Sequence, residues 1–267
     1  MNQKNLLSIL NSNYIILFSF LTTTTLCYIE PKFEACEPKT CGNNQSISYP
    51  FYIEGTQEPF CGYPGFALSC SNNGYPILNL SNSFYIIDQI SYDNQSLRVS
   101  NVVFSRSRTT NNKGCLPLIQ NLTLPSSNKF VVAPNQKDVL LFYGCDLSSL
   151  GLEAEHRIGC YEENNNETSS VVALYKEDNK NVGLVSRNCK GGVVDLMVED
   201  DVKGNNNTSN NIEEALRKGF LLNWIASDCK LCKSSGGRCG FDSSIFNFRC
   251  YCTDRIHAWK CDPPPPG

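Results

Sequence analysis

The sequence predicts a mainly β, disulfide-rich secreted ectodomain of two small β-rich modules, with one short helix and a cysteine-rich C-terminal segment. Cysteine supplies 15 of the 267 residues and histidine only two, a ratio typical of chains that form disulfides in an oxidising compartment. Short runs of β-branched and aromatic residues alternate with Gly, Pro, Asn and Ser, which is typical of strands joined by turns. An apolar stretch near the start of the chain indicates the secretory route.

Residues 1–27 are expected to form a signal peptide. Lys4 gives a short positive start, and the apolar residues 14–21 are too few to span a bilayer. Removal of this segment also removes Cys27 and leaves 14 cysteines, an even number. We therefore expect seven disulfides and no free thiol in the mature chain. These cysteines are Cys36, Cys41, Cys61, Cys70, Cys115, Cys145, Cys160, Cys189, Cys229, Cys232, Cys239, Cys250, Cys252 and Cys261.

The first module is expected over residues 33–160. Residues 84–92, 97–104, 130–133 and 139–143 are rich in β-branched and aromatic side chains and are bounded by Asn, Ser and Pro, so they are predicted to form strands. No stretch of this module repeats apolar residues with helical spacing, so the module is expected to be mostly β.

The second module is expected over residues 161–262, with strands at 171–175 and 193–198. The one predicted helix covers residues 212–218. Acidic side chains lie in its first turn and basic side chains in its last, which suits the helix dipole, and Gly219 is expected to end it.

The C-terminal segment holds six cysteines within 33 residues and few large apolar side chains, so disulfides must hold it together. A zinc site is the alternative for Cys229 and Cys232. The second close pair, Cys250 and Cys252, is separated by one residue, whereas zinc knuckles usually repeat a two-residue gap. Spacing alone leaves 15 pairings of six cysteines open. Residues 263–267 are expected to form a Pro-rich stub.

Charge and hydropathy exclude two classes of partner. The net charge is −3, without the strong basic excess of a nucleic-acid binder. After the signal peptide no stretch approaches 18 uninterrupted apolar residues, so no membrane span is expected.

Seven N-glycosylation acceptors behind a signal peptide indicate a glycosylated surface. They are Asn44, Asn79, Asn94, Asn121, Asn166, Asn206 and Asn207.

The sequence offers no catalytic constellation. His156 lies in a charged stretch and His257 inside the cysteine-rich segment, so both are expected to be ordinary non-catalytic residues. Glu54 and Glu58 are the only closely spaced acids near the aromatic-rich N-terminal region, and a solvated loop explains them. We therefore expect no enzyme activity, no cofactor and no metal ion.

Closely spaced motifs follow one another between residues 36 and 99. They are Cys36-x4-Cys41-Gly42, Tyr49-Pro50-Phe51, Cys61-Gly62-Tyr63-Pro64-Gly65-Phe66, Leu68-Ser69-Cys70, Ile87-x-x-Ile90-x-Tyr92 and Leu97-Arg98-Val99. This set resembles the galacturonan-binding domain of plant wall-associated receptor kinases. The resemblance implies that the ligand is a pectic polysaccharide or oligogalacturonide.

A second set of motifs lies in the second module. It comprises Gly219-Phe220, Trp224, Cys229-x-x-Cys232, Ser235-Gly236-Gly237-x-Cys239-Gly240 and Phe248-x-Cys250-x-Cys252. This set resembles the cysteine-rich associated domain of leaf-rust-resistance-type receptor-like kinases. The final Cys-x-Cys-x8-Cys spacing also resembles the second half of an EGF-like module, which implies the pairs Cys229–Cys239, Cys232–Cys250 and Cys252–Cys261.

Receptors of this kind continue into a membrane-spanning helix and an intracellular kinase, whereas the sequence given stops at Gly267. It contains no Gly-rich nucleotide loop, no catalytic Asp loop and no Asp-Phe-Gly motif, so no kinase activity is expected.

The distribution of charge gives candidate ligand contacts. No acidic residue lies between Asp93 and Asp138, while six basic residues do, and we call residues 94–137 the acid-free window. Because basic side chains bind carboxylates, the window predicts an anion-binding face. A solvated face without a ligand is the alternative. The candidate contacts are Arg98, Arg106, Arg108 and Lys113, with Tyr49, Tyr63 and Tyr92 as rings that stack on sugars or, alternatively, fill a small β core.

The sequence therefore predicts an ectodomain that binds cell-wall pectin without catalysis. The alternative is a protein-interaction or co-receptor ectodomain in plant defence signalling, whose partner is another receptor ectodomain. A secreted hydrolase ranks third. The expected location is extracellular, in the cell wall, with membrane tethering if the sequence is part of a receptor.

Overall fold

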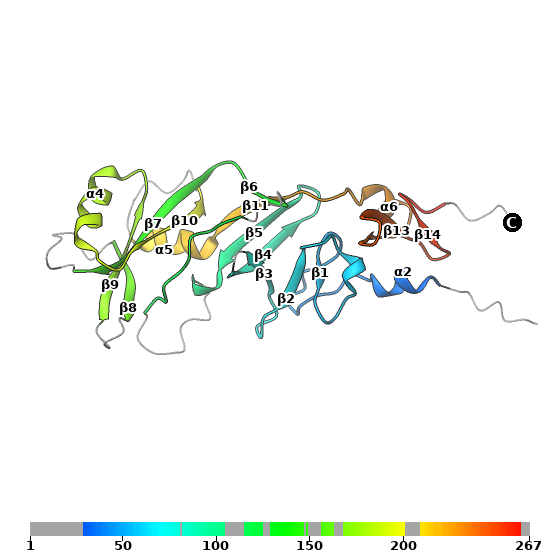
Figure 1. Ribbon diagram of the computed structural model, residues 1–267, viewed down its shortest axis with the longest axis horizontal. Helices are drawn as coiled ribbons and strands as arrows, with labels where there is room; N and C mark the ends of the chain where they lie inside the picture. The colour runs from blue at the N-terminus through cyan, green and yellow to red at the C-terminus, as the bar shows by residue number, and fades with distance from the viewer. Residues whose placement is uncertain are drawn as a thin grey trace, which may run out of the picture.

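The computed structural model describes residues 29–80, 82–104, 115–124, 129–146, 148, 156–162, 168–200 and 209–262. The molecule is elongated and carries three sheets in a row, a four-stranded sheet at one end, a seven-stranded sheet in the middle and a three-stranded sheet at the other end (Figure 1). Within the described residues, no helix is long and apolar enough to cross a membrane. The mainly β, disulfide-rich fold predicted from the sequence is confirmed.

The seven-stranded sheet is assembled from segments far apart in the sequence. Its neighbouring strands pair antiparallel, except that β1 and β2 pair parallel. In spatial order the strands are β1 (Tyr52–Ile53), β2 (Ala67–Cys70), β3 (Pro76–Leu80), β4 (Ser83–Ser91), β5 (Ser96–Asn101), β11 (Phe220–Trp224) and β6 (Phe130–Val132).

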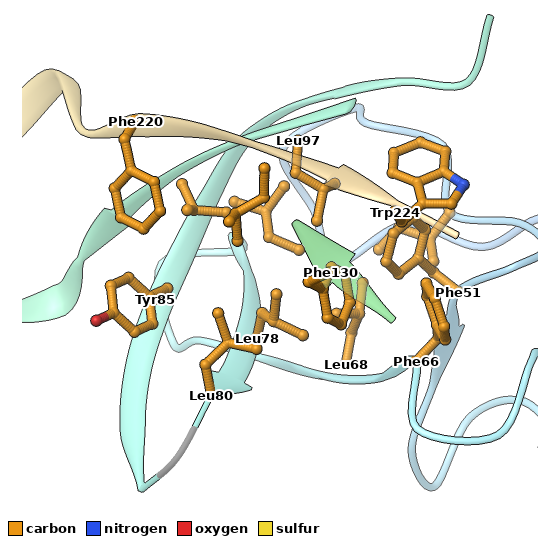
Figure 2. Close-up of a cluster of buried hydrophobic side chains, with 14 of the residues drawn as sticks. Phe51, Phe66, Leu68, Leu78, Leu80, Tyr85, Leu97, Phe130, Phe220 and Trp224 are labelled. Atoms are coloured by element: carbon orange, nitrogen blue, oxygen red, sulfur yellow. The ribbon is translucent and has the colours of Figure 1, made fainter. Parts of the chain in front are cut away.

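Apolar side chains from these strands converge on one buried cluster (Figure 2). Successive residues of a strand point to opposite faces, so Leu78 is buried while its neighbour Asn79 is exposed. The Phe51 ring lies at the centre of the aromatic contacts, 5.4 Å from the Phe66 centroid and 5.0 Å from that of Trp224. This cluster holds β11 against the N-terminal strands.

The four-stranded sheet is buried on both faces, since a helix covers each. In spatial order its strands are β10 (Val193–Glu199), β7 (Gln136–Cys145), β9 (Thr168–Tyr175) and β8 (Arg157–Glu162). Helix α5 (Ser209–Lys218) covers one face through Ile212 and Leu216, and α4 (Asn179–Asn188) covers the other through Val185.

Every strand predicted from the sequence overlaps an observed strand. The predicted strand 97–104 is too long, because residues 102–104 leave β5 as a 3₁₀ turn, η2 (Val102–Phe104). That turn is fixed by the Asn101 side chain, whose Oδ1 accepts a 3.0 Å hydrogen bond from the Val103 amide.

The predicted helix is α5, which begins three residues earlier than expected, at Ser209. It ends at Gly219, as predicted: the Gly219 amide donates to the Ala215 carbonyl at 2.8 Å, and its φ of 75° is one that glycine adopts readily. Helix α4 was not predicted, because it is short and has few apolar residues. Its N-terminus is capped by Asp178, whose Oδ1 accepts from the Asn181 amide at 3.3 Å.

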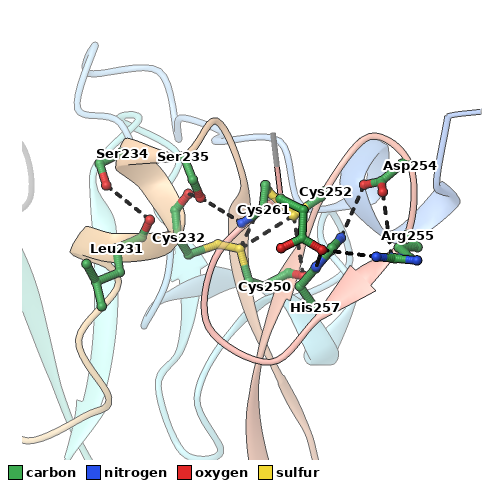
Figure 3. The surroundings of a disulfide bond; sticks show 11 residues. Leu231, Cys232, Ser234, Ser235, Cys250, Cys252, Asp254, Arg255, His257 and Cys261 are labelled. Atoms are coloured by element: carbon green, nitrogen blue, oxygen red, sulfur yellow. Dashed lines mark hydrogen bonds and ion pairs between the residues drawn. A yellow bond between two sulfur atoms is a disulfide. The ribbon is translucent and has the colours of Figure 1, made fainter. Parts of the chain in front are cut away.

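The C-terminal segment is a small disulfide-linked module with little apolar core of its own. It contains α6 (Lys230–Ser234) and a sheet of β12 (Arg238–Asp242), β13 (Asn247–Tyr251) and β14 (Ile256–His257). Disulfides join Cys229–Cys239, Cys232–Cys250 and Cys252–Cys261, which confirms the EGF-like pairing. Figure 3 shows the surroundings of the Cys232–Cys250 bridge.

The start of the described chain packs against this module. The Nζ of Lys32, on helix α2 (Pro31–Ala35), lies 5.1 Å from the centre of the Phe60 ring. Phe60 belongs to the short 3₁₀ turn η1 (Pro59–Cys61). The Glu30 amide donates to the Thr253 carbonyl at 2.9 Å. Both ends of the described chain therefore lie at the same end of the molecule (Figure 1).

All 14 cysteines expected to form disulfides do so in seven pairs. The four pairs outside the C-terminal module are Cys36–Cys61, Cys41–Cys70, Cys115–Cys160 and Cys145–Cys189. The last two tie the four-stranded sheet to the segments that flank it.

The strands do not divide at the predicted boundary between residues 160 and 161. β7 lies before that boundary but belongs to the sheet of the second module. β11 lies after it but sits between β5 and β6 of the first, and β8 runs across it. Each predicted module therefore contributes a strand to the sheet of the other. Such pairing between distant segments cannot be inferred from the local sequence of a strand.

Candidate functional site

A tight turn in the motif at residues 61–66 forms the centre of the candidate site. The Phe66 amide donates to the Tyr63 carbonyl at 3.0 Å, with Pro64 and Gly65 at the two central positions. Gly65 has a φ of 87°, as the third residue of a type II turn requires. The turn is anchored by buried Phe66 at one end and by the Cys36–Cys61 disulfide just before it.

Lys129 lies across this turn. A Cβ built on Gly65 would overlap the Lys129 ammonium and would lie 3.2 Å from its Cδ and Cε. Glycine is favoured here by the turn conformation, and the absence of a side chain lets the Lys129 side chain lie directly against the turn. Among the described residues, no carboxylate forms an ion pair with Lys129.

The other two described cations of the acid-free window are neutralised by acids from outside it. Arg98 on β5 donates to both carboxylate oxygens of Glu199, at 2.5 and 3.3 Å. The Nζ of Lys137, on β7, lies 2.8 Å from Oδ1 of Asp200. The Arg98 hydrogen bond lowers the pKa of Glu199, and the Asp200 hydrogen bond raises the pKa of Lys137, so both pairs are charged at neutral pH.

The remaining candidate cations, Arg106, Arg108 and Lys113, lie outside the described residues. The window as a whole is therefore not a uniformly free basic surface, since two of its described cations already have acidic partners. That pairing depends on strands β5, β7 and β10 meeting in space, which the sequence did not reveal.

Two of the three candidate tyrosines serve the fold. Tyr49 is 4% exposed and packs edge-on against Phe248 at 5.6 Å, so it has no free face for a sugar; burial raises the pKa of its hydroxyl. Tyr92 is half-buried, and its hydroxyl donates to the Ser46 carbonyl at 3.0 Å and accepts from the Ser48 amide at 2.9 Å. It ties the 46–48 loop to the end of β4.

Tyr63 is half-buried and joins two parts of the molecule. Its ring lies 5.5 Å from the Phe66 centroid in the central core and 4.8 Å from the Phe241 centroid in the C-terminal module. Phe246, at the tip of the β12–β13 hairpin, lies 6.5 Å away. Sequence analysis missed Phe246, and its place within a cysteine-rich segment gave no signal of a role.

The C-terminal cysteine sulfurs lie close together, but they are already bonded in pairs. The sulfur of Cys250 is 3.8 Å from that of Cys252 and 3.9 Å from that of Cys261 (Figure 3). Because these sulfurs belong to two disulfides, they supply no thiolate to a metal ion. His257 and Asp254 lie beside them (Figure 3). One ring nitrogen of His257 is 3.4 Å from Asp254 Oδ1, and the other is 3.4 Å from Asp262 Oδ2.

Four of the predicted glycosylation acceptors fall on described residues, and all four are exposed: Asn44, Asn79, Asn94 and Asn121. Asn121 also accepts a 2.8 Å hydrogen bond from the Asp195 amide on edge strand β10 through its Oδ1, which leaves its amide nitrogen for a glycan. Asn166, Asn206 and Asn207 lie outside the described residues.

Two protein-family models match the chain. The model described as wall-associated receptor kinase galacturonan-binding matches residues 36–101, and the one described as wall-associated receptor kinase C-terminal matches residues 159–255. Neither model describes a catalytic domain. Both resemblances inferred from the motifs are confirmed.

The curated relatives are receptor-like kinases of Arabidopsis thaliana. Leaf rust 10 disease-resistance locus receptor-like protein kinase-like 1.2 is 37% identical over 252 residues, which cover 92% of this chain and 36% of the relative. The kinase-like 2.1 protein is 25% identical over 263 residues, covering 92% and 38%. The chain thus spans little more than a third of the length of these relatives. No solved structure matches it significantly.

Proposed function

Because the chain belongs to the wall-associated receptor kinase family through its galacturonan-binding and C-terminal regions, we propose that it is an extracellular, glycosylated ectodomain that binds an acidic pectic polysaccharide without catalysis. Galacturonan is a chain of sugar rings that carry carboxylates, so its binding site needs cations that no protein carboxylate already occupies. The observation that carries the proposal is the placement of Lys129 across the Tyr63–Phe66 turn.

Lys129 meets the chemical requirement that its neighbours in the acid-free window do not. Arg98 and Lys137 are paired with Glu199 and Asp200, whereas Lys129 forms no ion pair with a described acid. Its ammonium is held over a turn of the galacturonan-binding region, where a carboxylate from solvent can approach it. Arg106, Arg108 and Lys113 belong to the same acid-free stretch of sequence and remain proposed ligand contacts on that ground alone.

A charge-reversal experiment tests this proposal. Binding of a de-esterified oligogalacturonide to the wild-type chain is expected to weaken steeply as salt rises, because exposed charges are screened over about 8–10 Å at physiological ionic strength. Lys129→Glu is expected to reduce affinity about tenfold or more at low salt, and fully methyl-esterified pectin, which lacks the charges, is expected to bind weakly to both proteins.

The matched control is Lys180→Glu, an exposed lysine on α4 at the opposite end of the molecule that also forms no described ion pair. It changes the net charge by the same amount but leaves the turn intact. Its effect on affinity therefore measures the contribution of the overall charge of the protein, separately from that of a local contact at the turn. Equal affinities of the two variants, or binding that ignores salt, would contradict the proposal and favour a protein-interaction ectodomain. Release of new reducing ends from pectin would contradict the non-catalytic part.

A further inference from the structure

Phe246 is an exposed aromatic residue held in a conformation that suits glycine. It lies at the tip of the β12–β13 hairpin, 68% exposed, with a φ of 50°. The left-handed region is unfavourable for a bulky residue, and a ring that faces water gains little from burial. Glycine or asparagine would serve the turn better, so the choice of phenylalanine points to a use for the ring.

The ring is nevertheless fixed in place by aromatic neighbours. It meets Phe241 edge-to-face, with centroids 5.0 Å apart and an interplanar angle of 83°. It also stands edge-on to Tyr63 at 6.5 Å and 71°. Phe241 is itself buried, so Phe246 rests on a rigid base while most of its surface stays free. Ile245, 55% exposed, extends the apolar surface by one residue.

This apolar surface and Lys129 both contact the Tyr63–Phe66 turn. Tyr63, which contacts Phe246, and Gly65, over which Lys129 lies, are two residues apart in that turn, so their Cα atoms are at most about 7 Å apart. A lysine without a described ion pair and an exposed aromatic side chain are therefore brought to neighbouring residues of the same turn. The two come from different regions of the chain, one between the two family matches and one within the second.

A uronic-acid sugar presents both features that this arrangement fits. A pyranose ring has an apolar face of C–H groups that packs on aromatic carbon, and the carboxylate at its edge pairs with a cation. We infer that Phe246, with Ile245, forms a stacking subsite for a sugar ring of the same acidic polysaccharide whose carboxylate pairs with Lys129. The inference rests on the proposed function, and it makes the binding site a composite of Lys129, placed over the Tyr63–Phe66 turn of the galacturonan-binding region, and of the hairpin in the C-terminal region.

The test compares variants of the full chain against de-esterified oligogalacturonide at low and at high salt. Phe246→Gly suits the φ of the site and removes the ring, so the fold is expected to keep its stability while affinity falls about tenfold or more. Because stacking is not screened by salt, the loss is expected to be the same at both salt concentrations, unlike that of Lys129→Glu. Phe246→Trp is expected to retain affinity.

Two further variants keep the outcome decisive. Phe246→Asn also tolerates a positive φ, and it replaces the glycine variant if that one loses its disulfides or its thermal transition. Phe84→Ala is the matched control, since Phe84 is a half-exposed aromatic residue that precedes Tyr85 on β4. Tyr85 lies at the far end of the core from Phe66 (Figure 2). The affinity of Phe84→Ala is expected to equal that of the wild type.

The outcomes separate the inference from the proposed function. Wild-type affinity in both Phe246→Gly and Phe246→Asn, with binding lost in Lys129→Glu, would overturn the stacking subsite and leave pectin binding standing. A fully salt-dependent loss in Phe246→Gly would also overturn it. A wild-type chain that binds no oligogalacturonide at low salt would overturn both, and the hairpin would then belong to a protein contact.

Discussion

At the scale of single residues, charge pairing decides which cations remain available to a ligand. Sequence reasoning found the acid-free window, and one of its lysines, Lys129, lies at the candidate site. It could not foresee that Glu199, a hundred residues further along the chain, would neutralise Arg98. Nor could it find Phe246, because its exposure and its contact with Tyr63 arise only when the hairpin folds against the galacturonan-binding region.

The ion pair of Glu199 makes stability depend on pH. Arg98 lowers the pKa of Glu199 below its usual value near 4.5, so the pair stabilises the fold above that pH and is lost as pH falls through the lowered pKa. Glu199→Gln is expected to cost about 1 kcal/mol or less at pH 7, since both side chains are partly exposed.

Urea unfolding at a series of pH values falling from pH 7 measures this effect. The difference between Glu199→Gln and wild type is expected to shrink as the pH falls through the lowered pKa of Glu199 and its carboxyl becomes protonated. A difference that stays constant across this range would show that Glu199 contributes through packing and not through its charge.

At the scale of secondary-structure elements, β11 connects the two family regions. Its five residues follow the second sheet in sequence but lie between β5 and β6 of the first. Runs of β-branched and aromatic residues bounded by turn residues predicted most long strands, since the composition of a run is a local signal. The place of β11 depends on a pairing across more than a hundred residues, and the sequence motifs around Gly219 and Trp224 marked the segment without indicating its partner strands.

The two tryptophans of the chain allow a matched test of this role. Trp224 on β11 is 3% exposed and packs on Phe51, whereas Trp259 in the C-terminal module is 59% exposed. Trp224→Ala is expected to cost about 3–5 kcal/mol in the free energy of unfolding, because it opens a cavity in the central core. Trp259→Ala is expected to cost about 1 kcal/mol or less. Similar losses, measured by denaturant titration, would contradict a central role for β11.

At the scale of the whole molecule, seven disulfides are spread over all three sheets and offset a modest core. Their number was predicted from cysteine parity and an expected secretory route, and three of their pairings were implied by the resemblance to an EGF-like module. The other four pairings needed the structure, since neither Cys115–Cys160 nor Cys145–Cys189 follows a spacing rule.

Thiol alkylation followed by intact-mass measurement checks this framework. We expect no cysteine among the 14 to be labelled in the native protein, and all of them after reduction under denaturing conditions. Replacing both members of Cys252–Cys261 is expected to cost about 2–5 kcal/mol, with the C-terminal module affected first because it has little core of its own. Labelling of two or more cysteines in the native protein would contradict the seven-bridge framework.

The position of β11 also has a mechanical consequence. The chain leaves β11 at Trp224 and runs along the long axis of the molecule directly into the C-terminal module (Figure 1). Tension applied at that end therefore pulls β11 along its own direction, perpendicular to the hydrogen bonds that join it to β5 and β6. All of those bonds share the load in shear, instead of opening one after another as they do when a strand is peeled from an edge. Beyond β11, the three short disulfide loops of the C-terminal module leave little slack to extend, so a pull is transmitted from one end of the molecule to the sheet beside the candidate site.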